Sequence, residues 1–178
     1  MMLRPAVLSD IPALNHLIAA SATGLSTGYY TPAQVASLLA HVFGVDTRLV
    51  EDGTYYVIER GGPPVACGGW SRRRTLFGGD QFAARADDAL DPAVDAARIR
   101  AFFVHPAAAR QGLGRQLLAH CEAVARAAGF RRSELMATLP GVPLYQAMGY
   151  RPIESVCHDL PDGVQVEFVR MGRSLDPP

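Results

Sequence analysis

The chain has 178 residues, of which 49% are hydrophobic and 19% charged, and its 17 basic residues, all arginine, balance 17 acidic residues. A chain of this length buries about 70% of the surface of its unfolded form, so it can fold without disulfide or metal support. A net charge of zero gives no reason to expect a nucleic-acid or membrane partner.

The numbers and spacing of the cysteines and histidines also indicate a fold without disulfide or metal support. Three scattered cysteines, and five histidines without metal-ligand spacing, predict neither a disulfide framework nor a metal site. No apolar stretch is long enough for a signal peptide or a membrane helix. We therefore expect a soluble, cytoplasmic protein.

The first half of the chain predicts two helices, from apolar spacings of three and four, and a hairpin, from two apolar runs that flank a turn. The predicted elements are a short strand at 3–6, a helix from Ser9 or Asp10 to about Gly24, a helix beginning at Thr31 and Pro32, and strands at 54–58 and 64–70. Residues 74–97 show no sustained period and are rich in aspartate. We expect a long acidic loop there.

Strands and helices alternate in the second half of the chain. The predicted elements are a strand at 99–104, a helix at 113–128, a strand at 133–138, a short helix at 142–148, and strands at 150–160 and 164–171. This order predicts an α+β (mixed α/β) fold with a central mixed sheet. We expect one domain over residues 1–173 and a flexible tail at 174–178, and the two closing strands could pair across a homodimer.

The densest chemical signal lies between the strand at 99–104 and the helix that follows it. A strand that passes into a helix through glycines exposes backbone N–H groups at the positive end of the helix dipole. Gly112 and Gly114 let that backbone approach a phosphate without interference from a Cβ atom. The turn lacks the Lys and Ser/Thr of an ATPase loop, and no acidic ribose partner follows it as in a dinucleotide site.

A second motif makes the pattern specific. Tyr145 is followed, after three residues, by Gly149 and Tyr150, and the first motif begins with a strand that ends Val104-His105-Pro106. Together they resemble the GNAT superfamily of acetyl-CoA-dependent N-acetyltransferases, with the motifs matching over 99–152 and the order of elements over 1–173. The resemblance implies a mostly antiparallel sheet that is splayed at an acetyl-CoA site.

The resemblance also implies a role for each matching residue. Tyr145 would be the general acid that protonates the CoA thiolate, since a phenol with a pKa of about 10 is protonated at neutral pH. The strand would pair with the pantetheine arm, and the turn would hold the pyrophosphate. The expected cofactor-binding residues are Phe102, Phe103, Val104, Arg110, Gln111, Gly112, Leu113, Gly114, Arg115 and Thr138.

Two positions depart from the family pattern. Ala109 stands where an Arg or Gln is usual, and Ala101 stands where many members carry a Glu that serves as the catalytic base, directly or through water. At neutral pH a lysine amine, with a pKa of about 10.4, is neutral in roughly one molecule in a thousand, whereas an α-amine, with a pKa of about 7.7, is roughly one-third neutral. We therefore expect a low-pKa amine or α-amine as acceptor, or a water chain from the amine to Glu134 or to a backbone carbonyl.

The expected acceptor-binding residues are aromatic and basic. They are Tyr29 and Tyr30, in the loop between the first two helices, and Trp70 and Arg72, at the end of the hairpin. Arg72 and the two arginines after it either receive an acceptor carboxylate or pair with the acidic loop. The sequence thus predicts an N-acetyltransferase that acts on a primary amine of a small molecule or peptide by direct attack in a ternary complex. The alternative is an acyl-CoA-binding sensor without turnover.

Overall fold

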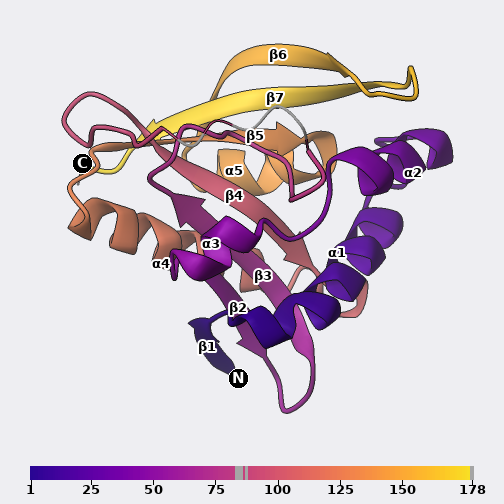
Figure 1. Ribbon diagram of the computed structural model, residues 1–178, viewed down its shortest axis with the longest axis horizontal. Helices are drawn as coiled ribbons and strands as arrows, with labels where there is room; N and C mark the ends of the chain where they lie inside the picture. The colour runs from indigo at the N-terminus through magenta and orange to yellow at the C-terminus, as the bar shows by residue number, and fades with distance from the viewer. Residues whose placement is uncertain (83–85, 87, 177–178) are drawn as a thin grey trace.

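A computed structural model describes residues 1–82, 86 and 88–176 and is built around one seven-stranded sheet, in the order β1-β2-β3-β4-β5-β7-β6 (Figure 1). The strands are β1 Met2–Pro5, β2 Tyr55–Glu59, β3 Pro64–Ser71, β4 Ala97–Val104, β5 Arg132–Thr138, β6 Arg151–Asp159 and β7 Gln165–Ser174. Among these described strands, β4 and β5 run parallel, and the other neighbours are antiparallel. The predicted mixed, mostly antiparallel sheet is confirmed.

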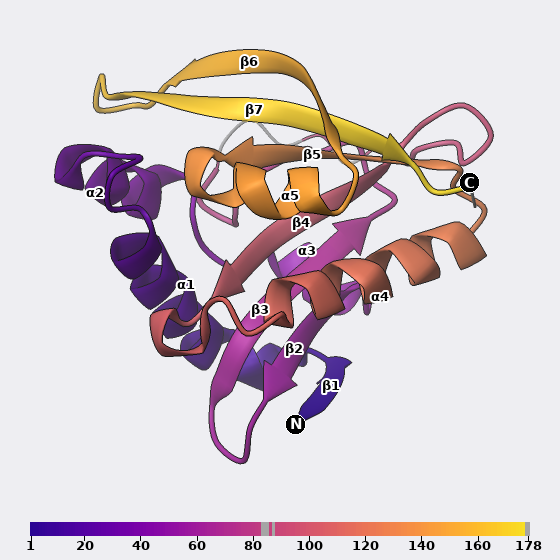
Figure 2. The same cartoon turned by 180° about the vertical axis from the view of Figure 1, so that it is seen from behind.

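Helices cover both faces of the sheet. They are α1 Ile11–Leu25, α2 Pro32–His41, α3 Thr47–Glu51, α4 Leu113–Ala127 and α5 Val142–Ala147, with short 3₁₀ turns at Leu8–Asp10, Pro106–Ala108 and Leu139–Gly141. Helices α1 and α3 lie on one face, and α4 and α5 lie on the other (Figures 1 and 2). No helix in the described part of the chain is long and apolar enough to cross a membrane.

Local chemistry explains where the helices begin. The Thr31 side chain accepts a hydrogen bond from the Gln34 N–H, and the Gln34 side chain accepts one from the Thr31 N–H, which forms a capping box at α2. Asp46 caps α3 in a similar way by accepting from the Arg48 N–H. Helix α3 was not predicted because five residues are too few to show a helical period.

The sheet separates in its middle. Strands β4 and β5 are paired only at Ala97↔Ser133 and Arg98↔Glu134, and beyond these residues they diverge. Strand β4 has a β-bulge where this separation begins. Two of its residues, Ala101 and Phe102, lie opposite the single residue Gly68 of β3. Ala101 has a φ of +56°, a left-handed conformation that alanine seldom adopts. The bulge bends β4 away from β5 and leaves a gap.

The ordered, packed part of the chain extends closer to the C-terminus than expected. Strand β7 continues to Ser174, and Leu175 is 5% exposed in the main core. The Leu175 N–H also donates to the Arg131 carbonyl at 2.8 Å. The predicted start of a flexible tail at residue 174 therefore falls inside a packed strand, while residues 177 and 178 lie outside the described part of the chain. Four residues of the predicted acidic loop, 83–85 and 87, also lie outside it.

Candidate active site

The gap between β4 and β5 opens into two adjoining cavities. The larger has a volume of about 680 Å³ and lies between α1 and the first turns of α4 and α5. The smaller has a volume of about 70 Å³ and is walled in part by the segments 42–44 and 76–79. The residues that line both cavities are Phe43, Phe102, Phe103, Thr138 and Tyr145. Two ligands, one in each cavity, would meet at these side chains.

The turn before α4 has the backbone geometry of an anion site. Arg110 and Gly112 have φ angles of +62° and +82°, and Gln111 between them has no positive φ. Such alternation points successive N–H groups toward one concave surface that suits an anion. Gly112 is the N-cap of α4, and no side chain among the described residues caps this helix. The turn therefore presents free donors at the positive end of a 15-residue helix.

The first turn of α4 packs closely against α5. A Cβ atom on Gly114 would lie 2.9 Å from Leu144 Cδ2, so any larger residue here would require the Leu144 side chain to shift. Arg110 and Arg115 are exposed and line the larger cavity. Every expected cofactor-binding residue lines this cavity except Gln111. The Gln111 side chain instead accepts from Arg60 and donates to the Ala107 carbonyl.

The edge of β4 that faces the gap is partly occupied by α1. The Val104 N–H donates to Ser21 Oγ at 3.2 Å, so one backbone donor of the expected pantetheine-binding strand already has a partner. Ser21 itself lines the larger cavity. On the opposite side of the bulge, the Tyr55 hydroxyl donates to the Ala101 carbonyl at 2.9 Å. Sequence reasoning missed Ser21, which looks like any small residue on the buried side of α1.

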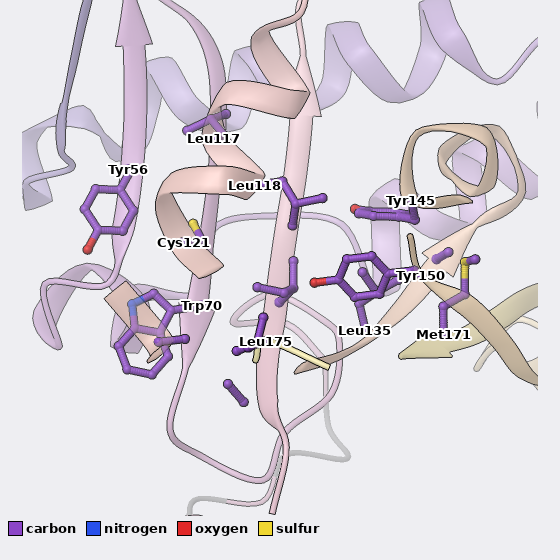
Figure 3. Close-up of a cluster of buried hydrophobic side chains, with 14 of the residues drawn as sticks. Tyr56, Trp70, Leu117, Leu118, Cys121, Leu135, Tyr145, Tyr150, Met171 and Leu175 are labelled. Atoms are coloured by element: carbon purple, nitrogen blue, oxygen red, sulfur yellow. The ribbon is translucent and has the colours of Figure 1, made fainter. Parts of the chain in front are cut away.

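Tyr145 of α5 lies in a buried cluster beside Tyr150 (Figure 3). It lines both cavities and so marks their junction. Its ring packs edge-on against Phe102 and Tyr150, with centroid distances of 6.5 Å and 5.8 Å. Burial raises the pKa of the Tyr145 phenol above its ordinary value. Within the described part of the chain its hydroxyl makes no hydrogen bond. The phenol is thus protonated at neutral pH and free to donate to a ligand.

Tyr150 lies next to Tyr145 but its hydroxyl is fully engaged. It lies 2.7 Å from Ser133 Oγ and donates to Glu122 at 2.9 Å. Burial also raises the pKa of the Tyr150 phenol. Tyr150 lines neither cavity, so its hydroxyl holds α4, β5 and the end of α5 together.

The expected acceptor-binding residues do not all reach the cavities. Tyr29 is exposed and lines the larger cavity. Tyr30 is buried, and its hydroxyl donates to the Glu167 carbonyl at 2.6 Å and accepts from the Leu139 N–H at 3.0 Å. Trp70 is buried beneath α4, edge-on to Phe130. Arg72 lies over the Trp70 ring at 5.5 Å. Tyr30 and Trp70 are thus buried in the fold, Arg72 is exposed, and none of the three lines either cavity.

Glu134 is held by two arginines on β4 and β7. Its Oε2 accepts from Arg98 at 2.9 Å and from Arg170 at 2.8 Å, and the residue lines neither cavity. The structure does not bring this expected proton acceptor to the junction. Of the two arginines after Arg72, Arg73 pairs with Asp52 at 2.7 Å, and Arg74 lies 3.8 Å from Asp88 of the acidic loop.

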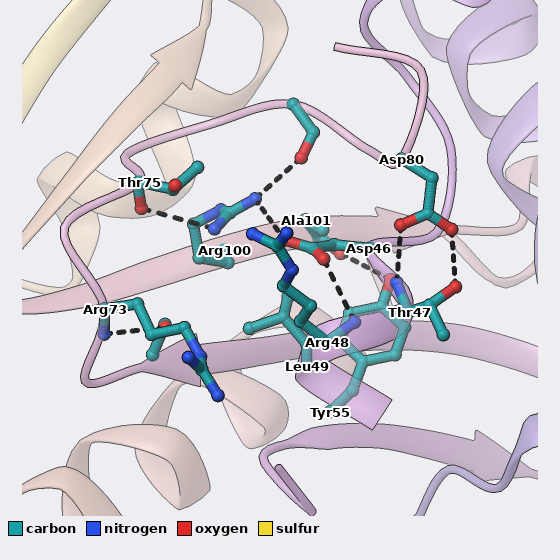
Figure 4. A network of polar contacts seen from close by, with 12 residues as sticks. Asp46, Thr47, Arg48, Leu49, Tyr55, Arg73, Thr75, Asp80, Arg100 and Ala101 are labelled. Atoms are coloured by element: carbon teal, nitrogen blue, oxygen red, sulfur yellow. Dashed lines mark hydrogen bonds and ion pairs between the residues drawn. The ribbon is translucent and has the colours of Figure 1, made fainter. Parts of the chain in front are cut away.

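A buried arginine on β4 is hydrogen-bonded to the loop that forms one wall of the smaller cavity (Figure 4). Arg100 is 2% exposed. Its guanidinium donates to Asp46 at 3.0 Å, to the Thr75 carbonyl at 3.2 Å and to the Gly78 carbonyl at 2.6 Å. It thereby ties β4 to the cap of α3 and to the loop that forms one cavity wall. Sequence reasoning missed this role, although an arginine inside an apolar strand was a signal for it.

A sequence model of the acetyltransferase (GNAT) family matches residues 25–150. No curated protein has a matching sequence. A GCN5-related N-acetyltransferase from Rhodopseudomonas palustris is similar in structure, with a TM-score of 0.73 at 17% identity, covering 97% of this chain and 94% of that chain. PaiA N-acetyltransferase from Thermoplasma acidophilum, in complex with coenzyme A, has a TM-score of 0.64 at 12% identity, covering 97% and 98%. Ribosomal-protein-alanine N-acetyltransferase from Brucella melitensis has a TM-score of 0.63 at 16% identity, covering 98% and 99%. Likeness at these identities shows a shared fold.

Proposed function

The chain belongs to the acetyltransferase (GNAT) family, and from this premise we propose that it transfers an acetyl group from acetyl-CoA directly to a primary amine of a small molecule or peptide within a ternary complex. One observation carries the proposal. The anion-binding turn at α4 and the unpartnered Tyr145 hydroxyl both lie on the larger cavity, which adjoins a second cavity at the gap in the sheet. Donor and acceptor can therefore approach from two sides.

The residues present fit acetyl-CoA. The N–H groups between Arg110 and Arg115 suit a pyrophosphate, and the two guanidinium groups can pair with its oxygens. The open edge of β4 at Phe102 and Phe103 suits the amides of an extended pantetheine arm. Acetyl-CoA supplies the activated acyl group as a thioester when bound. The coenzyme A in the Thermoplasma acidophilum relative supports this assignment.

Tyr145 supplies the proton that the leaving sulfur needs. As the acceptor nitrogen bonds to the carbonyl carbon and the C–S bond breaks, the phenol donates to the departing thiolate. Burial keeps this proton on the phenol at neutral pH. An amine that enters neutral releases its surplus proton to water, and the phenolate recovers a proton from solvent. Phe102 and Gly141 hold the ring in place, since a Cβ on Gly141 would lie 3.2 Å from Tyr145 Cε2.

A sensor that binds acyl-CoA without turnover is the second candidate. Two observations favour it: Ala101 brings no carboxylate to the gap, and Glu134 is paired with two arginines. The free Tyr145 hydroxyl favours the enzyme, because a protein that only binds needs no acid near the sulfur.

Release of CoA thiol separates the two candidates. Purified protein is mixed with acetyl-CoA and a panel of small amines, amino acids and peptides, and free thiol is followed over time. We expect release that depends on the amine. Tight binding of acetyl-CoA without release on any acceptor would instead favour the sensor.

A further inference from the structure

The smaller cavity has walls of apolar side chains. They come from Phe43 and Phe103, which pack on the α1 core, from Phe77 and Phe168 on the α2 side, and from Met136 of β5. Among the described residues that line it, only Thr138 and Tyr145 have polar side chains. The volume of about 70 Å³ suits a small group, since about 10–15 Å³ of such volume is enough to hold one water.

Four of the backbone carbonyls around this cavity already have donors. The Val42 carbonyl accepts from the Gly79 N–H at 2.7 Å, and the Phe43 carbonyl accepts from the Gln81 side chain at 2.6 Å. The Gly78 carbonyl accepts from Arg100 at 2.6 Å, and the Ala101 carbonyl accepts from Tyr55 at 2.9 Å. A carbonyl oxygen has two lone pairs, and each of these four oxygens already uses one of them, which reduces what they offer to the three N–H donors of an ammonium ion.

Two hydroxyl groups remain for a ligand. Thr138 Oγ1 lies beside Gly141, 3.2 Å from where a Cβ atom on that glycine would stand. Like the Tyr145 hydroxyl, it makes no hydrogen bond within the described part of the chain, and both residues line both cavities. Thr138 can accept one N–H hydrogen bond from an amine whose lone pair points toward the thioester.

From these contacts we infer that the smaller cavity is the acceptor subsite and that it takes a weakly basic primary amine, neutral at pH 7, on a small apolar group. The inference rests on the proposed acetyl transfer. An ammonium ion would lose its hydration among phenyl rings, and burying an unpaired charge costs far more than burying a neutral amine. The neutral amine also needs no protein base before it attacks.

A graded series of ethylamines tests the inference. Ethylamine and its 2-fluoro, 2,2-difluoro and 2,2,2-trifluoro derivatives have similar sizes, while each fluorine lowers the basicity of the amine. We expect kcat/KM at pH 7, based on total amine, to rise from ethylamine to the difluoro compound. Between about pH 6.5 and about 8.5, kcat/KM for ethylamine should rise about tenfold per pH unit, and that for trifluoroethylamine should stay flat.

A matched pair of variants tests the chemistry of the cavity wall. Met136→Glu places a carboxylate in the smaller cavity, and Met136→Gln places a side chain of the same size without charge. Burial raises the pKa of such a carboxyl, so it can take a proton from an ammonium near neutral pH. We expect the pH slope for ethylamine to flatten in Met136→Glu only. Thermal melts report whether both variants fold. If they do not, the pH profiles of the wild-type enzyme test the inference by themselves.

The outcomes separate the inference from the proposed function. If ethylamine is the best acceptor at pH 7 and its kcat/KM does not vary with pH, the enzyme binds and deprotonates an ammonium ion, and the inference alone is wrong. If no amine causes thiol release, the proposed acetyl transfer is wrong, and the inference falls with it.

Discussion

Gly112 and Gly163 share one backbone conformation in two different settings. Both have a φ of +82°, and a Cβ atom on either would meet nothing within 4 Å. Gly112 caps α4 at the larger cavity, whereas Gly163 lies in the exposed turn between β6 and β7. Alanine at either position should cost about 1–2 kcal/mol, because a Cβ disfavours the left-handed region.

The two substitutions should differ in ligand binding. We expect Gly112→Ala to weaken acetyl-CoA binding, because its turn moves away from the left-handed geometry that aims the N–H groups at a phosphate. Gly163→Ala should leave binding unchanged. Calorimetric titration with acetyl-CoA, beside urea unfolding of both variants, measures the two effects. Equal affinities in the two variants would contradict the role of the turn.

Single residues also show how far the sequence predicts the site. The family resemblance, which rests on the spacing from Tyr145 to Gly149 and Tyr150, was what pointed to this phenol. Tyr29 and Tyr30 could not be told apart, since which neighbour turns inward depends on the distant partners Glu167 and Leu139. Whether these residues bind ligands stays a prediction.

At the scale of elements, the Arg100–Asp46 pair sets how the loop at 75–78 lies against β4. Both side chains are buried, with 1% and 4% exposed. Removing one member of a buried ion pair takes this partner from the other charge, so Arg100→Met should cost about 3–5 kcal/mol. The double variant with Asp46→Asn should cost less than the sum of the single variants.

Urea unfolding of the two single variants and the double variant measures this coupling. The exposed pair Arg131–Asp176, with side chains 72% and 48% exposed, is the control. Arg131→Met should change stability by no more than about 1 kcal/mol. Additive costs at Arg100 and Asp46 would show that the pair does not act as a unit.

Elements with strong local signals were predicted closely, and those set by long-range contacts were not. Periodicity and glycine stops located α1, α4 and the hairpin of β2 and β3. The separation of β4 from β5 was expected only through the family resemblance. Its local cause, the φ of +56° at Ala101, has no sequence signal, since nothing marks this alanine as left-handed. Helix α3 is too short for any period.

At the scale of the whole molecule, buried thiols and phenols make the free energy of unfolding vary with pH in the alkaline range. Burial raises the pKa of Cys67 to about 12 and also raises that of Cys121. The unfolded chain then releases these protons first, near a thiol pKa of about 8.5, so the folded state binds more protons. Stability is fully present below that pH and falls as the pH rises toward the folded pKa values.

We expect the free energy of unfolding to fall by about 1.4 kcal/mol per pH unit for each buried thiol. Cys67→Ala should make the fall between about pH 9 and about pH 10 shallower by that amount. Cys157 is exposed in β6, so Cys157→Ala is the matched control and should keep the wild-type slope. Urea unfolding across this range gives the slopes, and an unchanged slope in Cys67→Ala would contradict the account.

The central claim is that Tyr145 is the acid at the junction of the two cavities. The most direct test compares kcat and the Kd of acetyl-CoA in Tyr145→Phe and Tyr150→Phe. We expect Tyr145→Phe to lower kcat about 10²–10⁴-fold and to leave the Kd unchanged. Tyr150→Phe should lose about 1–3 kcal/mol of stability and keep its kcat. A Tyr145→Phe enzyme that keeps its kcat, or that loses acetyl-CoA binding, would show that Tyr145 is structural and contradict the claim.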